Sequence, residues 1–216
     1  MFLLFFFVAE KDVILIDPPE FPENFPIPLP NPGISSDTFL SELESRTCSD
    51  VCQAYNASWI PKSKTTWTGD SASCDKGAYA ATALEDALNR INYLRWLGGV
   101  DGVNLSSEKN EGCQNCAVIL DANDIVHGSP GSQYKCWTAT GQNYCQVSLV
   151  ALADNASAAV HLYFNDTGSS TLGNRRWLLY PPLQSIGIGQ RRRGNAVQVI
   201  NTDNDYKRAV PFIAVP

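Results

Sequence analysis

Seven prolines fall within the fifteen residues from Pro18 to Pro32 of this 216-residue chain, and they restrict its N-terminal part severely. Proline has a fixed φ and no backbone N–H, so a run this dense excludes a helix or a central strand and favours the extended polyproline conformation. We therefore predict that residues 1–34 form an apolar, proline-rich arm outside the packed domain. The arm is either a stiff spacer or a segment that docks its alternating apolar residues in a groove of a neighbouring subunit.

The first residues of the arm are almost entirely apolar. Seven of the eight residues from Met1 to Val8 are Leu, Phe or Val, and the charged residues Glu10 and Lys11 follow. This pattern is typical of the apolar core of a signal peptide, which we assign to residues 1–9, although no basic residue precedes it. The run is too short to span a bilayer. No other stretch approaches the ~20 apolar residues of a transmembrane helix, so no transmembrane segment is expected.

Seven cysteines and four glycosylation sequons favour an oxidising, extracellular compartment. The cysteines, all of them disulfide candidates, are Cys48, Cys52, Cys74, Cys113, Cys116, Cys136 and Cys145. The sequons begin at Asn56, Asn104, Asn155 and Asn165. Because the number of cysteines is odd, at least one thiol stays free, or pairs with another chain or with a segment outside this sequence. We expect a secreted glycoprotein that carries N-linked glycans, either released or held at the cell surface.

The net charge of −6 argues against a nucleic-acid partner, because a general nucleic-acid binder needs a basic surface to displace counterions. One basic run stands out, Arg191-Arg192-Arg193. We interpret it as a solvated loop, with an anion-binding patch as the alternative.

Hydrophobic periodicity separates a cysteine-bearing N-terminal extension, residues 35–77, from a domain over residues 78–216. In the extension, a helix capped by Ser36 or Asp37 would place Cys48 and Cys52 on one face.

Three helices are predicted in the domain from apolar residues at three- and four-residue intervals. The first lies within residues 78–97 and ends at the Gly98-Gly99 pair, and the second covers about 106–126 with Ser106 or Ser107 at its cap. The third runs from about Asn155 to 164. Short β-branched runs at 183–189, 196–200 and 210–215 then predict strands. Helices followed by strands indicate an α+β fold whose final strands pair antiparallel.

Few residues of the domain have an obvious chemical use. The two histidines, His127 and His161, would need each other, carboxylates or thiolates to hold zinc. The spacing Cys113-x-x-Cys116 falls inside a predicted helix with no second pair, so disulfides to other cysteines are favoured over a metal or a redox dithiol. The chain lacks a nucleophile elbow, a phosphate loop and a dinucleotide fingerprint. No metal and no cofactor are therefore predicted.

The order of motifs nevertheless resembles a known family. The stretches "ALNRINYLRWLGGVDGVNL", "ILDANDIVHG", "YKCWTATGQNYC", "YFNDTG" and "LGNRRWLLYPPLQSIGIG" follow one another along the chain. Over about residues 80–216 the chain resembles the CAP superfamily (cysteine-rich secretory, antigen 5 and pathogenesis-related proteins), in its divergent SCP-like branch. The resemblance implies an α-β-α sandwich with a central antiparallel sheet, here preceded by the extended arm, in a secreted and disulfide-bonded protein.

Many CAP proteins have a cleft of two histidines and two acids, and the resemblance places four residues of this chain there. His127 matches the first histidine, and Asp166 the second acid. Gln142, in Gly141-Gln142-Asn143, stands where the family has glutamate, and Asn174 stands where it has histidine. Amides are neutral, cannot serve as general bases and ligate zinc poorly, so we interpret the cleft as vestigial. Arg175, Arg176 and Trp177 are then interpreted as a structural corner.

Three functions remain open from the sequence. The first is a non-catalytic CAP-like glycoprotein that binds or assembles with other protein subunits, in its sharper form a subunit of an extracellular filament or cell-surface coat that joins copies of itself through the arm. The second is a CAP-type hydrolase or protease using His127 with Asp166 or a glutamate. The third is a lipid- or sterol-binding module.

Overall fold

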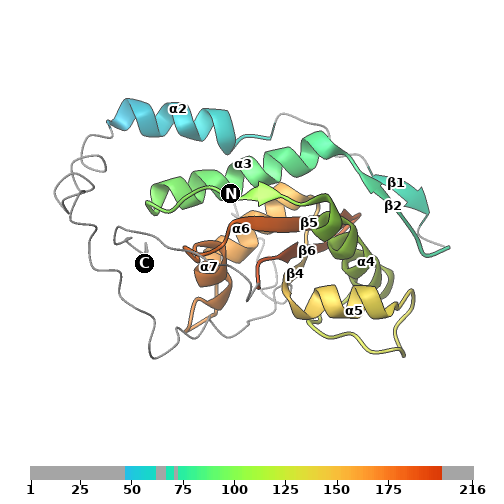
Figure 1. Cartoon of the computed structure of the whole chain (residues 1–216). Helices are drawn as coiled ribbons and strands as arrows, with labels where there is room; N and C mark the ends of the chain where they lie inside the picture. The colour runs from blue at the N-terminus through green and yellow to red at the C-terminus, as the bar shows by residue number, and fades with distance from the viewer. Residues whose placement is uncertain (1–46, 62–66, 71–72, 201–216) are drawn as a thin grey trace, which may run out of the picture.

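The computed structural model describes residues 47–61, 67–70 and 73–200 (Figure 1). The proline-rich arm, the candidate signal peptide, the helix caps expected at Ser36 or Asp37 and the strand expected at 210–215 lie outside the described residues. The described part is α+β, with helices around a four-stranded sheet.

The sheet has the strand order β3-β5-β6-β4. Its centre is the antiparallel hairpin of β5 (Ser185–Arg191) and β6 (Gly194–Gln198), and β4 (Ser148–Leu152) pairs antiparallel with β6. The predicted antiparallel pairing of the last two strands within the described residues is thus confirmed. The sheet as a whole is mixed, because the two-residue edge strand β3 (Asn104–Leu105) pairs parallel with β5.

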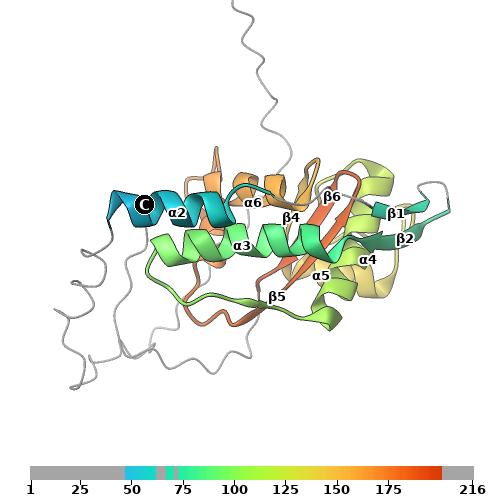
Figure 2. The same ribbon diagram turned by 90° about the horizontal axis from the view of Figure 1, so that it is seen from above.

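Helices cover both faces of this sheet. On one face lie α3 (Ala81–Leu97) and α6 (Ala156–Asn165), which share a core with Leu149, Ile188 and Val197 of the strands. On the other lie α4 (Ser107–Asn123) and α5 (Ala139–Gln146). Both ribbon views place α2 (Cys48–Ser58) toward one end of the molecule, and α4, α5 and the hairpin of β1 (Trp67–Asp70) and β2 (Asp75–Tyr79) toward the other (Figures 1 and 2).

The alternation of β5 explains how α4 comes so close to the sheet. Ile186 and Ile188 point to the α3 face, whereas Gly187 and Gly189 point to the α4 face. A Cβ atom on Gly189 would lie only 2.2 Å from the carbonyl carbon of Cys113 in α4. The helix backbone therefore rests on the strand backbone, which only glycine permits here.

The three predicted helices of the domain are confirmed, and their ends follow the expected local chemistry. The Ser106 hydroxyl accepts a hydrogen bond from the Lys109 amide at the start of α4, and the Asn155 Oδ1 atom accepts one from the Ala158 amide, at 2.8 Å, at the start of α6. Gly98 caps α3, and Gly99 follows with a left-handed φ of 68°.

Among its described residues, the extension packs on the domain through a helix and a hairpin. Helix α2 (Cys48–Ser58) begins at Cys48, because Thr47 and Asp50 form a reciprocal capping box at its first turn. The expected start near residue 36 was therefore wrong for the helix that carries both cysteines. Strands β1 (Trp67–Asp70) and β2 (Asp75–Tyr79) pair antiparallel beyond it, and β2 runs across the boundary expected at residue 77.

Candidate functional site

The four residues assigned to the family cleft fall into two pairs. His127 and Gln142 lie on the connection from α4 to α5 and on α5 itself, whereas Asp166 and Asn174 join the end of α6 to α7 (Gly173–Leu178). Figure 1 places α4 and α5 toward one end of the molecule and α7 away from them, with α6 between. Within the described residues, no hydrogen bond or ion pair of the structure links one pair to the other.

The first pair is held by short-range polar contacts around Ser129. The exposed His127 accepts a hydrogen bond at Nδ1 from the Ser129 amide, at 3.0 Å, and its ring lies 5.7 Å from that of Tyr134. The Gln142 side chain accepts from the Trp137 indole N–H and donates to the Ser129 hydroxyl. Because Nδ1 is an acceptor, the neutral ring carries its proton on Nε2. In the described contacts no carboxylate orients this imidazole, as a general base of the Ser-His-Asp type would require.

The second pair is buried, and its two residues are hydrogen-bonded to each other. Asp166 ends α6 in the left-handed region, with φ 47°, and is only 2% exposed. Its carboxylate accepts hydrogen bonds from the backbone and side-chain amides of Asn174, both at 2.9 Å, and from the Arg175 amide at 3.3 Å. The negative charge therefore sits on the backbone N–H groups at the start of α7, where a helix stabilises an anion. This is a connection between two helices in which both carboxylate oxygens of Asp166 already accept hydrogen bonds.

At the corner between α6 and α7, the Arg175 side chain binds backbone carbonyl groups. Arg175 donates from Nε to the Phe164 carbonyl at 2.6 Å and from a terminal nitrogen to the Asn165 carbonyl at 3.1 Å, and its guanidinium lies over the Phe164 ring. Trp177 packs edge-on against Tyr180 at 5.5 Å, while Arg176 is exposed. These contacts fix the turn between α6 and α7.

A residue that the sequence analysis did not single out anchors the next turn. Arg95 of α3 is fully buried and donates to the carbonyls of Asp101, Leu178, Tyr180 and Leu183. The sequence pattern could have indicated that Arg95 is buried, because it follows Ile91 by four residues and so lies on the apolar side of its helix. Arg90 of the same helix donates to the carbonyls of Trp59 and Ser157 and ties the extension to α6.

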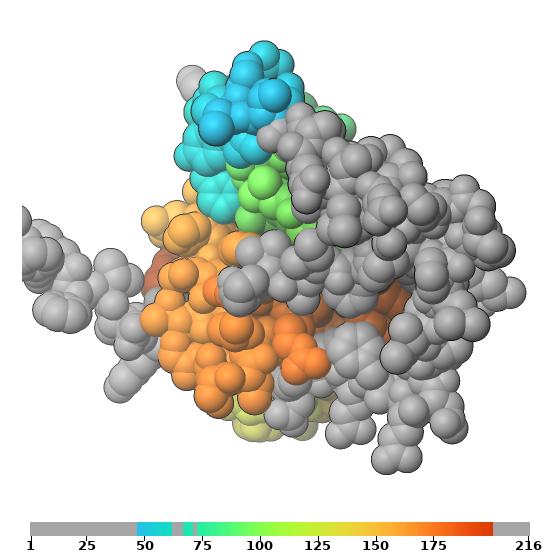
Figure 3. All heavy atoms as spheres, turned by 90° about the vertical axis from the view of Figure 1, so that its left-hand side faces the viewer, coloured from blue at the N-terminus to red at the C-terminus, as the bar shows by residue number. Residues whose placement is uncertain are grey.

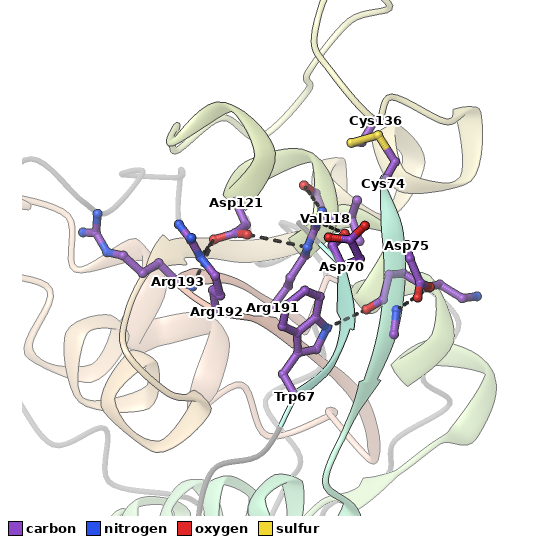
Figure 4. A network of polar contacts seen from close by, with 12 residues as sticks. Trp67, Asp70, Cys74, Asp75, Val118, Asp121, Cys136, Arg191, Arg192 and Arg193 are labelled. Atoms are coloured by element: carbon purple, nitrogen blue, oxygen red, sulfur yellow. Dashed lines mark hydrogen bonds and ion pairs between the residues drawn. A yellow bond between two sulfur atoms is a disulfide. The ribbon is translucent and has the colours of Figure 1, made fainter. Parts of the chain in front are cut away.

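The triple-arginine turn between β5 and β6 takes part in a network of polar contacts with α4 and the β1–β2 hairpin (Figure 4). Arg191 is fully buried, donates to the carbonyls of Val118 and Asp70, and lies 5.2 Å from the Trp67 ring. The interpretation of the whole run as a solvated loop was therefore wrong at Arg191, although Arg192 is exposed. Burial is tolerated because the fork of guanidinium donors meets fixed oxygens.

The carboxylate of Asp121 balances the charge of this turn. It lies 3.5 Å from Nε of both Arg191 and Arg192, and it accepts a hydrogen bond from the Arg193 amide. Arg193 in turn pairs with Asp124 at 3.0 Å. An external anion would compete with these carboxylates, so the cluster is built as an internal ion-pair network rather than as an anion site.

Two disulfides are formed among the seven cysteines. Cys74 pairs with Cys136, which ties the β1–β2 hairpin to the α4–α5 connection, and Cys116 pairs with Cys145, which ties α4 to α5. Cys113 does not join its neighbour Cys116. It is a buried free thiol 3.8 Å from the Ser148 hydroxyl, and burial raises its pKa to about 12. It is therefore neutral and inert as a nucleophile at physiological pH.

The sequon asparagines differ in their surroundings. Asn56, Asn104 and Asn165 are exposed, whereas Asn155 is partly buried as the cap of α6. In the described ranges no three His, Cys, Asp or Glu residues lie close enough together to hold a metal ion. His161 lies on α6, and its ring packs edge-on against Trp59.

Comparison with known proteins does not identify a family for this chain. The sequence matches no protein-family model, and no curated protein matches it either. None of the helices in the described ranges is long and apolar enough to cross a membrane.

Proposed function

We propose that this chain is a secreted, non-catalytic protein with a CAP-like domain that works by binding or assembling with other protein subunits. The observation that carries the proposal is the hydrogen-bonded Asp166–Asn174 pair. Asn174 is fully buried and Asp166 nearly so, and the Asp166 carboxylate is taken up by three N–H groups of Asn174 and Arg175. An acid used in this way holds two helices together and cannot approach a substrate.

The extracellular part of the proposal rests on the two disulfides. Each joins elements distant in sequence, with separations of 62 and 29 residues, as is typical of domains that mature in an oxidising compartment. The exposed sequons at Asn56, Asn104 and Asn165 give glycans an unobstructed place on the surface.

Assembly into a filament or cell-surface coat is the sharper form of the proposal. It uses the proline-rich arm as the connector, because a segment that docks on the next copy makes a head-to-tail contact that need not close. We expect the full chain, secreted from a eukaryotic host, to form fibres or large regular particles by light scattering followed by electron microscopy.

The matched control for this experiment is a chain without residues 18–34, which keeps the N-terminal segment and the domain. This variant should be monomeric or, at most, a small oligomer. Fibres that persist without the arm would remove it as the connector. A full chain that remains a uniform monomer would overturn the assembly proposal.

The catalytic alternative is tested separately through His127, which is exposed and uses only Nδ1 in its hydrogen bond with the Ser129 amide. We expect the wild-type chain and His127→Ala to be equally inactive on peptide and ester libraries. A turnover that the substitution reduces more than about 100-fold, typical of loss of a general base, would identify an enzyme instead.

A further inference from the structure

Helix α2 carries two thiols that have no partner within the chain. Cys48 and Cys52 are exposed and free, and they lie one helical turn apart on the same side of α2. All seven cysteines of the sequence fall in the described ranges, so no cysteine elsewhere in the chain remains to pair with them. In the space-filling view α2 forms an outer edge of the molecule above α3 (Figure 3).

The third free cysteine is out of reach of this pair. Cys113 is fully buried in α4, where it contacts Ser148 of the sheet. Helix α2 packs instead on α3, which covers the opposite face of the same sheet. A disulfide from Cys113 to either exposed thiol would have to pass through the sheet.

Cys48 and Cys52 are also poorly placed to bond with each other. Residues four apart on a helix have Cβ atoms about 5–6 Å apart, whereas a disulfide needs about 3.5–4.5 Å. Closing that gap would distort the first turns of α2, which the Thr47–Asp50 capping box holds in place. Both routes to an internal disulfide are therefore unfavourable.

We propose that the α2 helices of two copies of this chain pack antiparallel and are joined by two disulfides, each from Cys48 of one copy to Cys52 of the other. The proposal rests on the secreted half of the proposed function, which supplies the oxidising conditions. Two cysteines one turn apart are self-complementary about a two-fold axis between them, so a second copy matches the spacing without any further requirement. The larger exposed apolar side chains of the described residues, Tyr55 and Ile60, belong to this helix and the residues just after it.

The charge of α2 does not oppose this contact. Asp50 is two positions from each cysteine, so it points to the other side of the helix. Its carboxylate is already occupied by the Thr47 amide and hydroxyl. The sequon residue Asn56 lies one turn beyond Cys52, so a glycan there would flank the joint.

The oxidation needs an external disulfide, for which we name oxidised glutathione. The Cys48 thiolate attacks one glutathione sulfur, forms a mixed disulfide and releases one glutathione thiolate. The Cys52 thiolate of the second copy then attacks the Cys48 sulfur and releases the other. For each link, two protein S–H bonds and one glutathione S–S bond become one protein S–S bond and two glutathione thiols.

The test uses the full chain, secreted from a eukaryotic host, on non-reducing denaturing gels that keep only covalent links, and the chain without residues 18–34, which cannot assemble through the arm, by light scattering. We expect about twice the monomer mass, reversed by dithiothreitol, and a peptide map that links Cys48 to Cys52. The double variant C48S/C52S should lose nearly all of this dimer, and C113A should keep it. Co-expression of C48S with C52S should restore a dimer with a single link, because each copy then supplies one of the two matching thiols.

Three results would overturn the proposal. They are a monomer whose Cys48 and Cys52 both react with iodoacetamide, a monomer whose peptide map shows a link within one α2, and a dimer that survives dithiothreitol but is dissociated by a chelator. If Cys74–Cys136 and Cys116–Cys145 are oxidised in any of these cases, only this inference fails. If all seven cysteines react with iodoacetamide, the secreted function fails as well.

Discussion

The two faces of the central sheet are packed by different means. Toward α3 and α6 the strands present large apolar side chains, among them Leu149, Ile188 and Val197. Toward α4, strand β5 presents Gly187 and Gly189, and the helix backbone lies directly on this strand, with Val150 and Ala196 of the other strands packed beside it. The first face depends on the volume that its side chains fill, and the second, along β5, on the absence of side chains. The two faces should therefore respond to opposite kinds of substitution.

The largest expected effect is on the side-chain face. Ile188→Ala removes a fully buried side chain from the core and should lower the free energy of unfolding by about 4 kcal/mol, since it leaves a cavity. Urea denaturation measures the change. The control Ile188→Val, which removes one methyl group, should cost about 1 kcal/mol. Equal losses in the two variants would show that this face does not depend on filled volume.

On the glycine face, adding a single methyl group should lower the free energy of unfolding by nearly as much as Ile188→Ala does. Gly189→Ala places a Cβ atom against the backbone of Cys113 and Gln114, which cannot rotate away, so we expect a loss of about 3 kcal/mol in the same assay. The matched control is Gly98→Ala, whose Cβ would meet nothing closer than 3.5 Å in a right-handed conformation with φ −77°. A Gly189 variant as stable as the Gly98 variant would break the comparison.

Alkaline pH should weaken both faces, because each buries a proton-bearing group. Burial raises the pKa of Cys113, on the α4 face, from its ordinary value of 9.0 to about 12, and raises the pKa of Tyr163, on the α6 face, well above 10.0. The folded state thus holds these protons more tightly than the unfolded state does. Their contribution is complete below pH 9 and is lost as the pH rises through the folded pKa values.

Stability measured from pH 8 to 11 should accordingly fall in the wild-type chain. C113A should fall less steeply, because only the Tyr163 contribution remains. A slope that is the same in both chains would mean that the thiol takes no part in the loss.

The smallest expected effect concerns the helix cap on the α6 side. Asn155→Ala removes the hydrogen bond from the Ala158 amide and should cost about 1 kcal/mol. Asn56→Ala is the matched control, since it also deletes a sequon but lies on the exposed side of α2. Its unfolding midpoint should stay close to that of the wild type, and a drop as large as that of the Asn155 variant would point to lost glycans rather than to the cap.

Local signals explain which elements the sequence predicted. Helices α3, α4 and α6 have clear apolar spacing and recognisable ends, such as Ser106 and Asn155, so their positions follow from short-range chemistry. Strand β4 was missed because Ser148–Leu152 is buried on both faces and shows no alternation. Helix α5 was missed because it is short and mostly polar, and its position depends on the Cys116–Cys145 disulfide.

The polar clusters were harder to predict, because their partners are far apart in the sequence. Arg191 is buried by virtue of carbonyl groups at Val118 and Asp70, which lie 73 and 121 residues away. No pattern around the arginine reveals those contacts. The sequence did point to Asp166 and Asn174, which are only eight residues apart. It did not show that the Asp166 carboxylate would cap the start of α7.

The strand order β3-β5-β6-β4 has a consequence for how the protein is made. The two edge strands leave the ribosome first, and the central hairpin, residues 185–198, emerges after both of them. Until then the edge strands of the nascent chain lack the central strands with which they pair, and its helices have no sheet to cover. Domains tend to fold as units during synthesis, so this one should stay open to chaperones and oxidoreductases until its last strands appear. Cys116 and Cys145 are both translated before that moment, so their disulfide can form while the sheet is still incomplete.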